Sequence, residues 1–475
     1  MFGRRSYLRV SCGDGVFKRG PIVLGSAAAL SILAAGCGNQ YRPVVSAINP
    51  VGPASQPTKY AIAISAPSPT AQGLLTFVDF AGDTVLTTPN VLANPVYLAL
   101  APGGGTGYAI NSAGSFNEFP AGSPSTLISS QIGQSTLSAG SQPVSITSVS
   151  MAGTNASVFV PEPALSQVAA LTSTGSLDQN IGVPNNPIYV VGANAGRRAY
   201  VISEGDGVTA STVSSVESGN LAVSSTIPVG INPTYGVMTS DGNRAFILNK
   251  GSGTVNVINV VNNGPDQAMP VIPATGTLGQ GPVWADLSPT TTQLVVLNQG
   301  DGTHPGSLSI INIPLCNAAS PATNPNCNPA NPVDAVGFGT VLATVPVGIN
   351  PVMVSVLQDG TKAYVANQGV ICAAGATNCT NVEGSVSVVN LASGLVSATL
   401  PGNSSASATA DTNTTPTAVY GHPTTIAATT GTPTGKVYVT SLDNKFMTVI
   451  ETDTDTIETH VNLQGLGVRV VVTAQ

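Results

Sequence analysis

Two acidic turns carry the side chains that are best suited to chemistry or ligand binding. One turn reads Ser203-Glu204-Gly205-Asp206-Gly207 and the other Gln299-Gly300-Asp301-Gly302-Thr303-His304. Their carboxylate oxygens could bind a hard cation such as calcium. However, Asp-Gly is also ordinary turn chemistry, and neither turn has the dense ligand spacing of a dedicated calcium site. We therefore predict no metal site, and we keep Glu204, Asp206, Asp301 and His304 as candidate binding residues.

The three histidines, His304, His422 and His460, are scattered along the chain. His422 precedes a proline, at a position where related segments have Asn or Gln, so we expect a structural role for it. The sequence contains no paired acid and base, no nucleophile motif and no cofactor fingerprint. It therefore predicts no catalytic residue and no cofactor.

The cysteines indicate an oxidising compartment. Apart from Cys12 and Cys37 near the N-terminus, four cysteines form two local pairs, Cys316 with Cys327 and Cys372 with Cys379. An even number of cysteines in an exported protein is typical of disulfides. The alternative is a metal site, but no cluster of histidines or carboxylates accompanies either pair. We predict one disulfide within each pair.

The N-terminal segment has the features of an export signal. Five basic residues within the first 19 precede an uncharged apolar stretch at residues 22–35. This order is typical of a secretory signal, and the stretch is shorter than the roughly 20 residues that span a bilayer. One interpretation of this segment is an ordinary signal peptide, in which case Cys37 follows it by chance.

The run Leu33-Ala34-Ala35-Gly36-Cys37 resembles the lipobox of bacterial lipoproteins. The resemblance implies that residues 1–36 are removed and that Cys37 is lipidated, which would attach the protein to a membrane. Residues 37–57 would form a flexible tether. Gly38 after the cysteine implies an outer-membrane destination, with a periplasmic or surface orientation.

The charge balance argues against nucleic acid as a partner. Only 8% of the residues are charged and the net charge is −7, whereas roughly a quarter of residues are charged in an average protein. Removal of residues 1–36 would take away five of the 15 basic residues and one of the 22 acidic ones, leaving −11. Phosphate contacts require Lys and Arg, so such a surface does not suit nucleic acid.

A repeat that recurs about every 40–50 residues determines the predicted fold. One copy begins at Val229-Gly230-Ile231-Asn232-Pro233, passes Asp241-Gly242, and continues through Arg244-Ala245-Phe246-Ile247-Leu248-Asn249 to residues 254–259. The same order returns at residues 347–390 and 422–450, and weaker copies begin at residues 94, 142, 186 and 281. Each copy contains four short apolar, β-branched runs separated by turn residues. Four-stranded units repeated in this way are typical of an all-β propeller.

This unit resembles the YVTN β-propeller repeat, whose pattern runs Gly-x-Asn-Pro, Asp-Gly, Tyr-Val-x-Asn and Val-x-Val-Ile-Asp. The resemblance covers nearly all of the chain after about residue 58 and is strongest at residues 228–260, 345–400 and 420–463. It implies a single propeller domain at residues 58–475.

The chain ends predict the number of blades and how the ring closes. We label the strands a to d from each x-Pro start. Seven starts are visible, and three strand-like runs before the first, at residues 60–65, 74–80 and 84–88, read as b, c and d. One further apolar run follows the last repeat, at residues 468–473, and we interpret it as a strand a. We expect it to pair with the first three strands and complete eight blades, or seven if residues 94–141 do not form a blade.

Propeller geometry places the d–a and b–c connections on one face, here called the b–c face, and the a–b and c–d connections on the other, the a–b face. We predict that the b–c face binds a ligand, because functional loops extend from a rigid scaffold. The candidate residues on it are Glu204, Asp206, Asp301, His304, Glu383, His422 and Asp443.

These features predict an exported, lipid-anchored binding or scaffold module of the cell envelope, monomeric, with an envelope protein or glycan as its partner. The alternative is an envelope enzyme of the lactonase-like or quinone-dependent dehydrogenase-like propeller type, which rests on analogy of fold. Convergent carboxylates, histidines or arginines at the central channel would favour the enzyme. Mostly Ser, Thr and Asn there would favour the binder.

Overall fold

The computed structural model describes residues 59–473, apart from residues 69, 125–126, 128, 266–271, 274–279, 290–291, 315–336, 374–378, 404–415 and 430–434. The chain divides into two units, Met1–Ser55 and Gln56–Gln475. The predicted signal peptide, Cys37, its tether, and the pair Cys316 and Cys327 lie outside the described residues. Within the described part, no helix has the length and apolar character that would let it cross a membrane.

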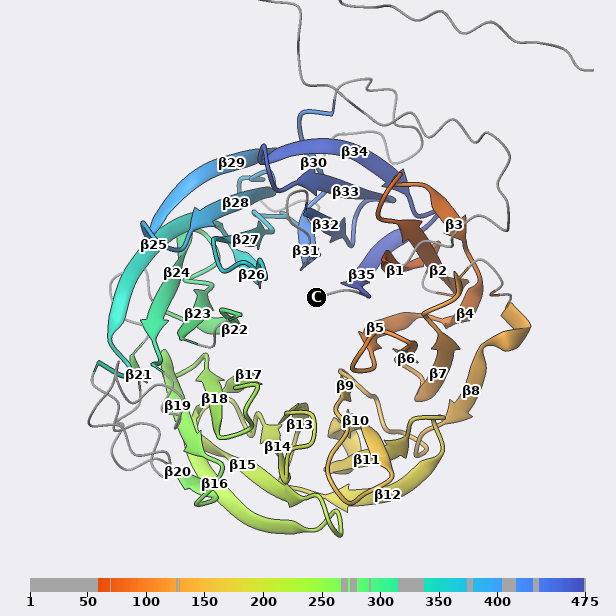
Figure 1. Ribbon diagram of the computed structural model, residues 1–475, viewed down its shortest axis with the longest axis vertical. Helices are drawn as coiled ribbons and strands as arrows, with labels where there is room; N and C mark the ends of the chain where they lie inside the picture. The colour runs from red at the N-terminus through yellow and green to blue at the C-terminus, as the bar shows by residue number, and fades with distance from the viewer. Residues whose placement is uncertain are drawn as a thin grey trace, which may run out of the picture. The chain divides into compact units, whose positions relative to one another are not determined.

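Eight sheets, antiparallel except for one short parallel pair, surround a common axis in the second unit (Figure 1), which confirms the predicted eight-bladed, all-β propeller. The innermost strands, one per blade, are β35 (Leu466–Val472), β5 (Pro95–Leu100), β9 (Thr147–Ser148), β13 (Pro187–Gly192), β17 (Pro233–Met238), β22 (Pro282–Leu287), β26 (Pro351–Val356) and β31 (Pro423–Ala428). The second strands are β1 (Tyr60–Ala66), β6 (Thr106–Asn111), β10 (Ala156–Glu162), β14 (Arg198–Ser203), β18 (Arg244–Asn249), β23 (Gln293–Asn298), β27 (Lys362–Asn367) and β32 (Lys436–Ser441). We number the blades 1 to 8 in this order.

The outer half of each blade completes the sheet. The third strands are β2 (Gln72–Asp79), β7 (Ser115–Pro120), β11 (Gln167–Thr172), β15 (Ala210–Glu217), β19 (Thr254–Asn259), β24 (Pro305–Asn312), β28 (Ser385–Asn390) and β33 (Phe446–Glu451). The outermost strands are β3 (Val85–Thr87) with β4 (Asn90–Ala93), β8 (Gly133–Thr136), β12 (Leu177–Gly182), β16 (Val223–Ile231), β20 (Gly264–Pro265) with β21 (Ile272–Pro273), β25 (Val341–Ile349), β29 (Leu395–Asn403) with β30 (Val419–Tyr420), and β34 (Thr456–Asn462). The 3-10 turns η2 (Ser129–Gln131) and η3 (Pro163–Leu165) lie in blades 2 and 3. The unit at residues 94–141 forms the complete sheet β5–β8, so the count is eight and not seven.

The repeated motif has a direct structural explanation. At six of the seven x-Pro starts the residue before the proline has a positive φ, for example 50° at Asn232 and 51° at Asn350, and His422 is the exception. Asn tolerates this left-handed conformation better than most residues do. The Asn that ends the second strand then binds the incoming chain: Asn249 Oδ1 accepts a hydrogen bond from Gly230 N at 3.1 Å, and Asn367 Oδ1 accepts one from Gly348 N at 3.1 Å. The motif residues therefore anchor the crossover between neighbouring blades.

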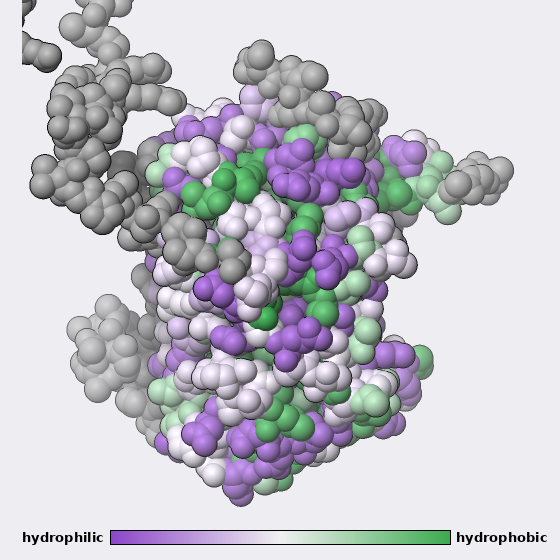
Figure 2. Space-filling view, turned by 90° about the vertical axis from the view of Figure 1, so that its right-hand side faces the viewer, coloured by the Kyte–Doolittle hydropathy of each residue, from purple (hydrophilic) through white to green (hydrophobic). Residues whose placement is uncertain are grey.

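The hydrophobic core lies between the blades. In the described residues, eight apolar clusters each fill one interface between neighbouring blades. Because the middle strands are covered on both faces, they read as continuous apolar runs such as that of β18, in which all six residues are buried. The outside of the ring is mixed, and Figure 2 shows hydrophilic and hydrophobic residues interspersed over one side of the molecule.

The ring closes as predicted. β35 pairs with β1 in the sheet order β3-β2-β1-β35, with Ala61 opposite Val472. Tyr60 N also donates a hydrogen bond to Thr473 Oγ1 at 2.9 Å. The innermost strand of blade 1 therefore comes from the end of the chain and its other strands from the beginning of the propeller.

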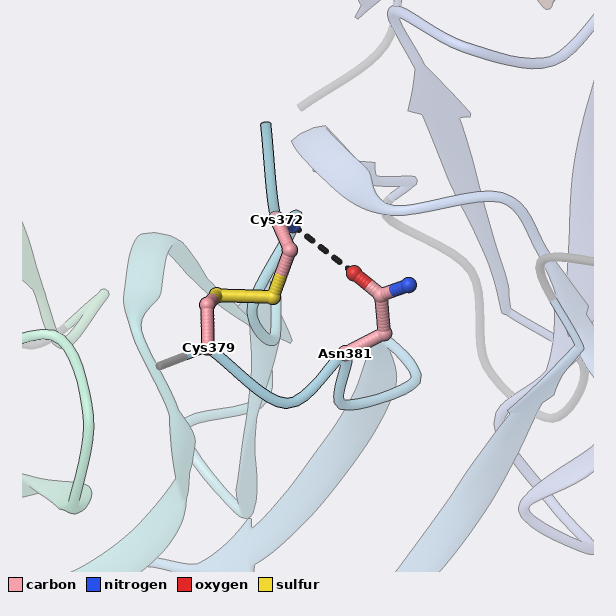
Figure 3. Close-up of a disulfide and its surroundings, with 3 residues drawn as sticks. All are labelled: Cys372, Cys379 and Asn381. Atoms are coloured by element: carbon pink, nitrogen blue, oxygen red, sulfur yellow. Dashed lines mark hydrogen bonds between the residues drawn. A yellow bond between two sulfur atoms is a disulfide. The ribbon is translucent and has the colours of Figure 1, made fainter. Parts of the chain in front are cut away.

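The predicted disulfide Cys372–Cys379 is confirmed, and it cross-links the loop between β27 and β28 (Figure 3). Cys372 N donates a hydrogen bond to Asn381 Oδ1 at 2.7 Å, which ties the two sides of this loop together.

Candidate functional site

The innermost strands place equivalent residues around the axis in two layers. The first layer consists of the residues two positions after the opening proline. Gly467 takes the place of that proline in β35, since it lies opposite Ser65 as Pro423 lies opposite Ser441. The members of the first layer are Arg469, Tyr97, Ser145, Tyr189, Tyr235, Trp284, Met353 and Thr425. The second layer lies two residues further along and consists of Val471, Ala99, Thr147, Val191, Val237, Asp286, Ser355 and Ala427.

Small polar side chains of both layers bind the next blade. The inner edge of each innermost strand has backbone groups without a strand partner, and such edges need other partners. Ser145 Oγ donates to Ile188 O at 2.7 Å, and Thr425 Oγ1 accepts from Val470 N at 3.1 Å. The same type of contact recurs at Thr147 and Ser355. Asp286 and Met353 likewise accept a hydrogen bond from the next blade, through a carboxylate oxygen and a thioether sulfur. These layers therefore connect neighbouring blades along the axis.

Five large side chains of the first layer form an aromatic–arginine cluster: Tyr97, Tyr189, Tyr235, Trp284 and Arg469. The ring centres of Tyr189 and Tyr235 are 4.7 Å apart, and those of Tyr235 and Trp284 are 3.9 Å apart. The guanidinium carbon of Arg469 lies 4.0 Å from the centre of the Tyr97 ring and 5.5 Å from that of Trp284. Cation–π attraction favours this placement of the arginine. The cluster thus joins side chains from blades 1, 2, 4, 5 and 6.

The aromatic–arginine cluster borders an axial cavity with two lobes. The larger lobe has a volume of about 580 Å³, and its walls include Tyr97, Tyr189 and Arg469. The smaller lobe has a volume of about 330 Å³, and its walls include Trp284, Asp286 and Arg469. Because Arg469 lines both lobes, it lies where they meet. Residues of the a–b turns also line the lobes, so the cavity reaches the a–b face and not the predicted b–c face.

Arg469 and Asp286 are the only charged residues among the described residues that line this cavity. Arg469 Nε is buried and has no hydrogen-bond partner. A buried polar group without a partner is costly in free energy. The guanidinium already forms a hydrogen bond with the Tyr97 hydroxyl, and its Nε is left for an acceptor oxygen that a ligand could supply beside it.

Asp286 occupies the second layer of blade 6. Its Oδ2 accepts a hydrogen bond from Val356 N of blade 7 at 2.9 Å, and its Oδ1 accepts one from Leu287 N at 2.8 Å. Burial raises the pKa of Asp286 to about 6, although these two N–H groups favour the charged carboxylate. At pH 7 most of the molecules therefore carry a negative charge at this position.

Tyr97 and Tyr235 keep their protons at neutral pH. Burial raises the pKa of Tyr97, and Arg469 opposes the increase only in part. Burial also raises the pKa of Tyr235 well above its usual value. Their hydroxyl groups can therefore donate or accept hydrogen bonds to a ligand but do not supply a negative charge.

The structure places the sequence-predicted residues on b–c and d–a connections, but in separate blades. Contacts within this set join Asp301 Oδ2 to His304 Nδ1 at 2.6 Å and Asp443 Oδ2 to His422 Nδ1 at 2.5 Å, each pair inside its own blade. The remaining members are Glu204 and Asp206 in the β14–β15 loop and Glu383 in the β27–β28 loop. Over the described ranges, no three His, Cys, Asp or Glu side chains gather as metal ligands would.

In the two acidic turns, the aspartate carboxylates accept hydrogen bonds from backbone N–H groups of the same turn. Asp206 Oδ1 accepts hydrogen bonds from Val208 N at 2.9 Å and Thr209 N at 2.8 Å. Asp301 Oδ1 accepts one from Thr303 N at 2.8 Å. The bond from Thr303 contributes most to lowering the pKa of Asp301, and the bond from Thr209 does so for Asp206. This geometry supports the turn interpretation of both segments.

Sequence reasoning missed the axial cavity, although a signal was present. Four of the seven x-Pro starts have an aromatic residue two positions later, at Tyr97, Tyr189, Tyr235 and Trp284. Alignment of the repeats would have shown this column, and Arg469 stands in it two positions after Gly467. The cavity therefore combines an arginine, a carboxylate and aromatic rings. The arginine and the carboxylate are among the groups expected at the channel of an enzyme, whereas the aromatic rings belong to neither of the two contents predicted for the channel.

Comparison with known proteins supports the fold and goes no further. No protein-family model and no curated protein match the sequence. The apo structure of AztD from Citrobacter koseri is 12% identical, with a TM-score of 0.55 over 87% of this chain and 97% of that chain. Dihydro-heme d1 dehydrogenase NirN in complex with DHE is 12% identical, with a TM-score of 0.58 over 88% of this chain and 77% of that chain. At such identities the similarity shows the β-propeller fold alone.

Proposed function

We propose that this protein is an exported, lipid-anchored binding protein of the cell envelope that holds a small molecule in its axial cavity. The observation that carries the proposal is Arg469, whose buried Nε lacks a partner between the rings of Tyr97 and Trp284. Ligand sites are typically concave and largely apolar, with a few well-placed polar groups. Most residues that line the axial cavity are apolar or aromatic, and Arg469 and Asp286 are its charged groups, although polar atoms form slightly more than half of the exposed lining.

The proposed cellular location of the protein is inferred from the sequence of its N-terminus. The run that ends at Cys37 supports lipidation, and Gly38 supports an outer-membrane destination. The repeat pattern supports membership of the YVTN-repeat lipoproteins. In this proposal the b–c face remains available to an envelope protein or a glycan, the propeller is monomeric, and nucleic acid is not a partner.

An enzymatic function is the second candidate, and Asp286 favours it. A carboxylate whose pKa is about 6 can act as a general base near neutral pH. However, both oxygens of Asp286 already accept backbone hydrogen bonds, one of them from blade 7. This arrangement suits a fixed charge that positions a ligand better than a base that must accept a proton.

A capture experiment tests the proposal. The full lipidated protein, extracted from membranes in detergent, is dialysed against the small-molecule fraction of its own cell envelope, and retained compounds are identified by mass spectrometry. Arg469→Met is the matched control, since it keeps an unbranched apolar stem and removes the guanidinium. A compound enriched by the wild type and not by Arg469→Met supports the proposal. Equal enrichment by both proteins, or none, contradicts it.

A further inference from the structure

We propose that the ligand of the axial cavity is a small zwitterionic amino acid, whose carboxylate binds Arg469 and whose ammonium group binds Asp286. This inference rests on the proposed binding function and names the chemical class of the ligand.

The first argument is the separation of two opposite charges within one lobe. Arg469 comes from β35 in blade 1 and Asp286 from β22 in blade 6, and both line the smaller lobe. Among the ion pairs of the described residues, none joins these two side chains. Opposite charges that face one cavity without pairing are complementary to a ligand that carries both charges itself.

Both groups also retain hydrogen-bonding capacity. Arg469 Nε has no partner, and a guanidinium can bind a carboxylate through two parallel N–H groups. Each oxygen of Asp286 accepts one backbone hydrogen bond, and a carboxylate oxygen can accept a second. A carboxylate at Arg469 and an ammonium group at Asp286 would therefore add bonds without breaking those that connect blades 6 and 7.

The two charged groups restrict the charge of the ligand. With a single arginine and one carboxylate in the lobe, a dianion such as phosphate would add to the negative charge of Asp286. A monocarboxylate is balanced by Arg469 alone. The rings of Tyr235 and Trp284, which border the same lobe, stack on each other, so they contribute apolar surface to its wall and no further charge. A ligand with only one of the two charges would balance one of these protein groups and leave the charge of the other unbalanced.

The size of the lobe fits a small molecule. Its volume of about 330 Å³ lies at the lower end of the range of about 300–1,000 Å³ for ligand sites. The competing interpretation is that Arg469 only braces blades 1, 2 and 6 through its contacts with Tyr97 and Trp284. In that case substitutions at Arg469 would change the stability of the ring and no ligand would respond to them.

Calorimetric titration of the full protein with defined probes tests the inference. The probes are a panel of α-amino acids and an ω-amino acid series from glycine to 6-aminohexanoate. For the chain length that binds best, the matched carboxylic acid and the matched amine are the single-charge controls. We expect the zwitterion to bind at least about tenfold more tightly than either control, the equivalent of one lost charge pair. Equal affinities for the zwitterion and its single-charge controls would overturn the inference.

Three variants test whether Arg469 binds the carboxylate of the ligand and Asp286 its ammonium group. Arg469→Met should weaken binding of the zwitterion at least about tenfold, and Arg469→Lys, which keeps the charge, should restore part of the affinity. Asp286→Asn should bind the zwitterion and the matched carboxylic acid equally well. Thermal melts of each variant identify any that fails to fold, and the remaining variants then carry the test. Unchanged zwitterion binding in folded Arg469→Met or Asp286→Asn protein would contradict the assignment.

The results of the two experiments distinguish an incorrect ligand class from an incorrect binding function. If no amino acid binds but dialysis recovers another compound that depends on Arg469, the class is wrong and the proposed binding function stands. If neither experiment detects a ligand, both are wrong.

Discussion

Arg469 lies opposite Ile64 in the antiparallel ladder that joins β35, the last strand of the chain, to β1, the first strand of the propeller. The strand that closes the ring therefore also supplies the cation of the axial cavity. Closure of the fold and assembly of the candidate site are consequently one event, because Arg469 reaches Tyr97 and Trp284 only when β35 is in place.

Deletion of residues 467–475 should destabilise the whole ring. It removes the buried side chains of Val470 and Val472 and leaves the edge of β1 without a partner. Burial of two such side chains alone contributes about 3–6 kcal/mol. Thermal melts measure the effect, and deletion of residues 38–57 is the control that should leave the melting temperature nearly unchanged. A wild-type melting temperature for the C-terminal deletion would show that closure is dispensable.

Cys37→Ala should release the protein from membranes or stall its processing, because two acyl chains provide stable attachment. Fractionation of cells into soluble and membrane material measures the outcome. Substitution of Cys12, which precedes the predicted cleavage site, is the matched control and should not alter the distribution. Recovery of Cys37→Ala protein in the membrane fraction at the wild-type level would argue against lipidation.

Replacing both Cys372 and Cys379 with Ser should loosen the β27–β28 loop while the propeller stays folded. The disulfide closes a short loop, so we expect a loss of about 2–3 kcal/mol at most. Peptide mapping without reduction checks this bond and also tests the predicted bond between Cys316 and Cys327. Free thiols or crossed linkages in the exported protein would be incompatible with the two predicted pairs.

The stability of the propeller should fall as pH rises from about 4 to 6. Burial raises the pKa of Asp286 to about 6, so in this range the folded state binds more protons at Asp286 than the unfolded state does. A pKa of about 6 for Asp286 in the folded state, against 3.8 in the unfolded chain, corresponds to about 1–3 kcal/mol. Asp83, which faces Lys436 and Glu458 at the junction of blades 8 and 1, contributes in the same direction, because burial raises its pKa to about 6 as well.

Chemical denaturation at pH 4.5 and pH 6.5 measures this dependence. Asp286→Asn should reduce the difference between the two values, and adding Asp83→Asn should reduce it further. If the double variant kept the full pH dependence, other groups would have to be responsible for it.

Binding of an amino acid should weaken about tenfold between pH 7 and pH 5, because Asp286 is then mostly protonated. The carboxylate and ammonium groups of the ligand keep their charges throughout this range. Calorimetric titrations at the two pH values, with Asp286→Asn as a variant that should show no such change, check the prediction. A pH-independent affinity of the wild-type protein would place the ammonium group elsewhere.

The sequence by itself predicted the β-propeller fold and the closing strand, and it favoured eight blades over seven. These features depend on local signals: runs of β-branched residues, Asp-Gly turns such as Asp241-Gly242, and Asn-Pro starts such as Asn232-Pro233. Each signal reflects the conformational preferences of a few neighbouring residues. Repetition of the same order at regular intervals then leaves a propeller as the expected architecture, and the leftover runs at the two ends predict how it closes.

The tertiary structure alone decided which side chains meet on the axis. Arg469, Tyr97 and Trp284 belong to three different blades and are distant in sequence, so no local preference indicates that they touch. Their contact depends on the twist of each blade and on the closure of the ring, which bring equivalent positions of the innermost strands together. The acidic turns illustrate the converse, because Asp206 and Asp301 stand out in the sequence and yet bind their own backbone. Residue type marks a group that could do chemistry, but only the packing of the whole ring determines which groups face a common cavity.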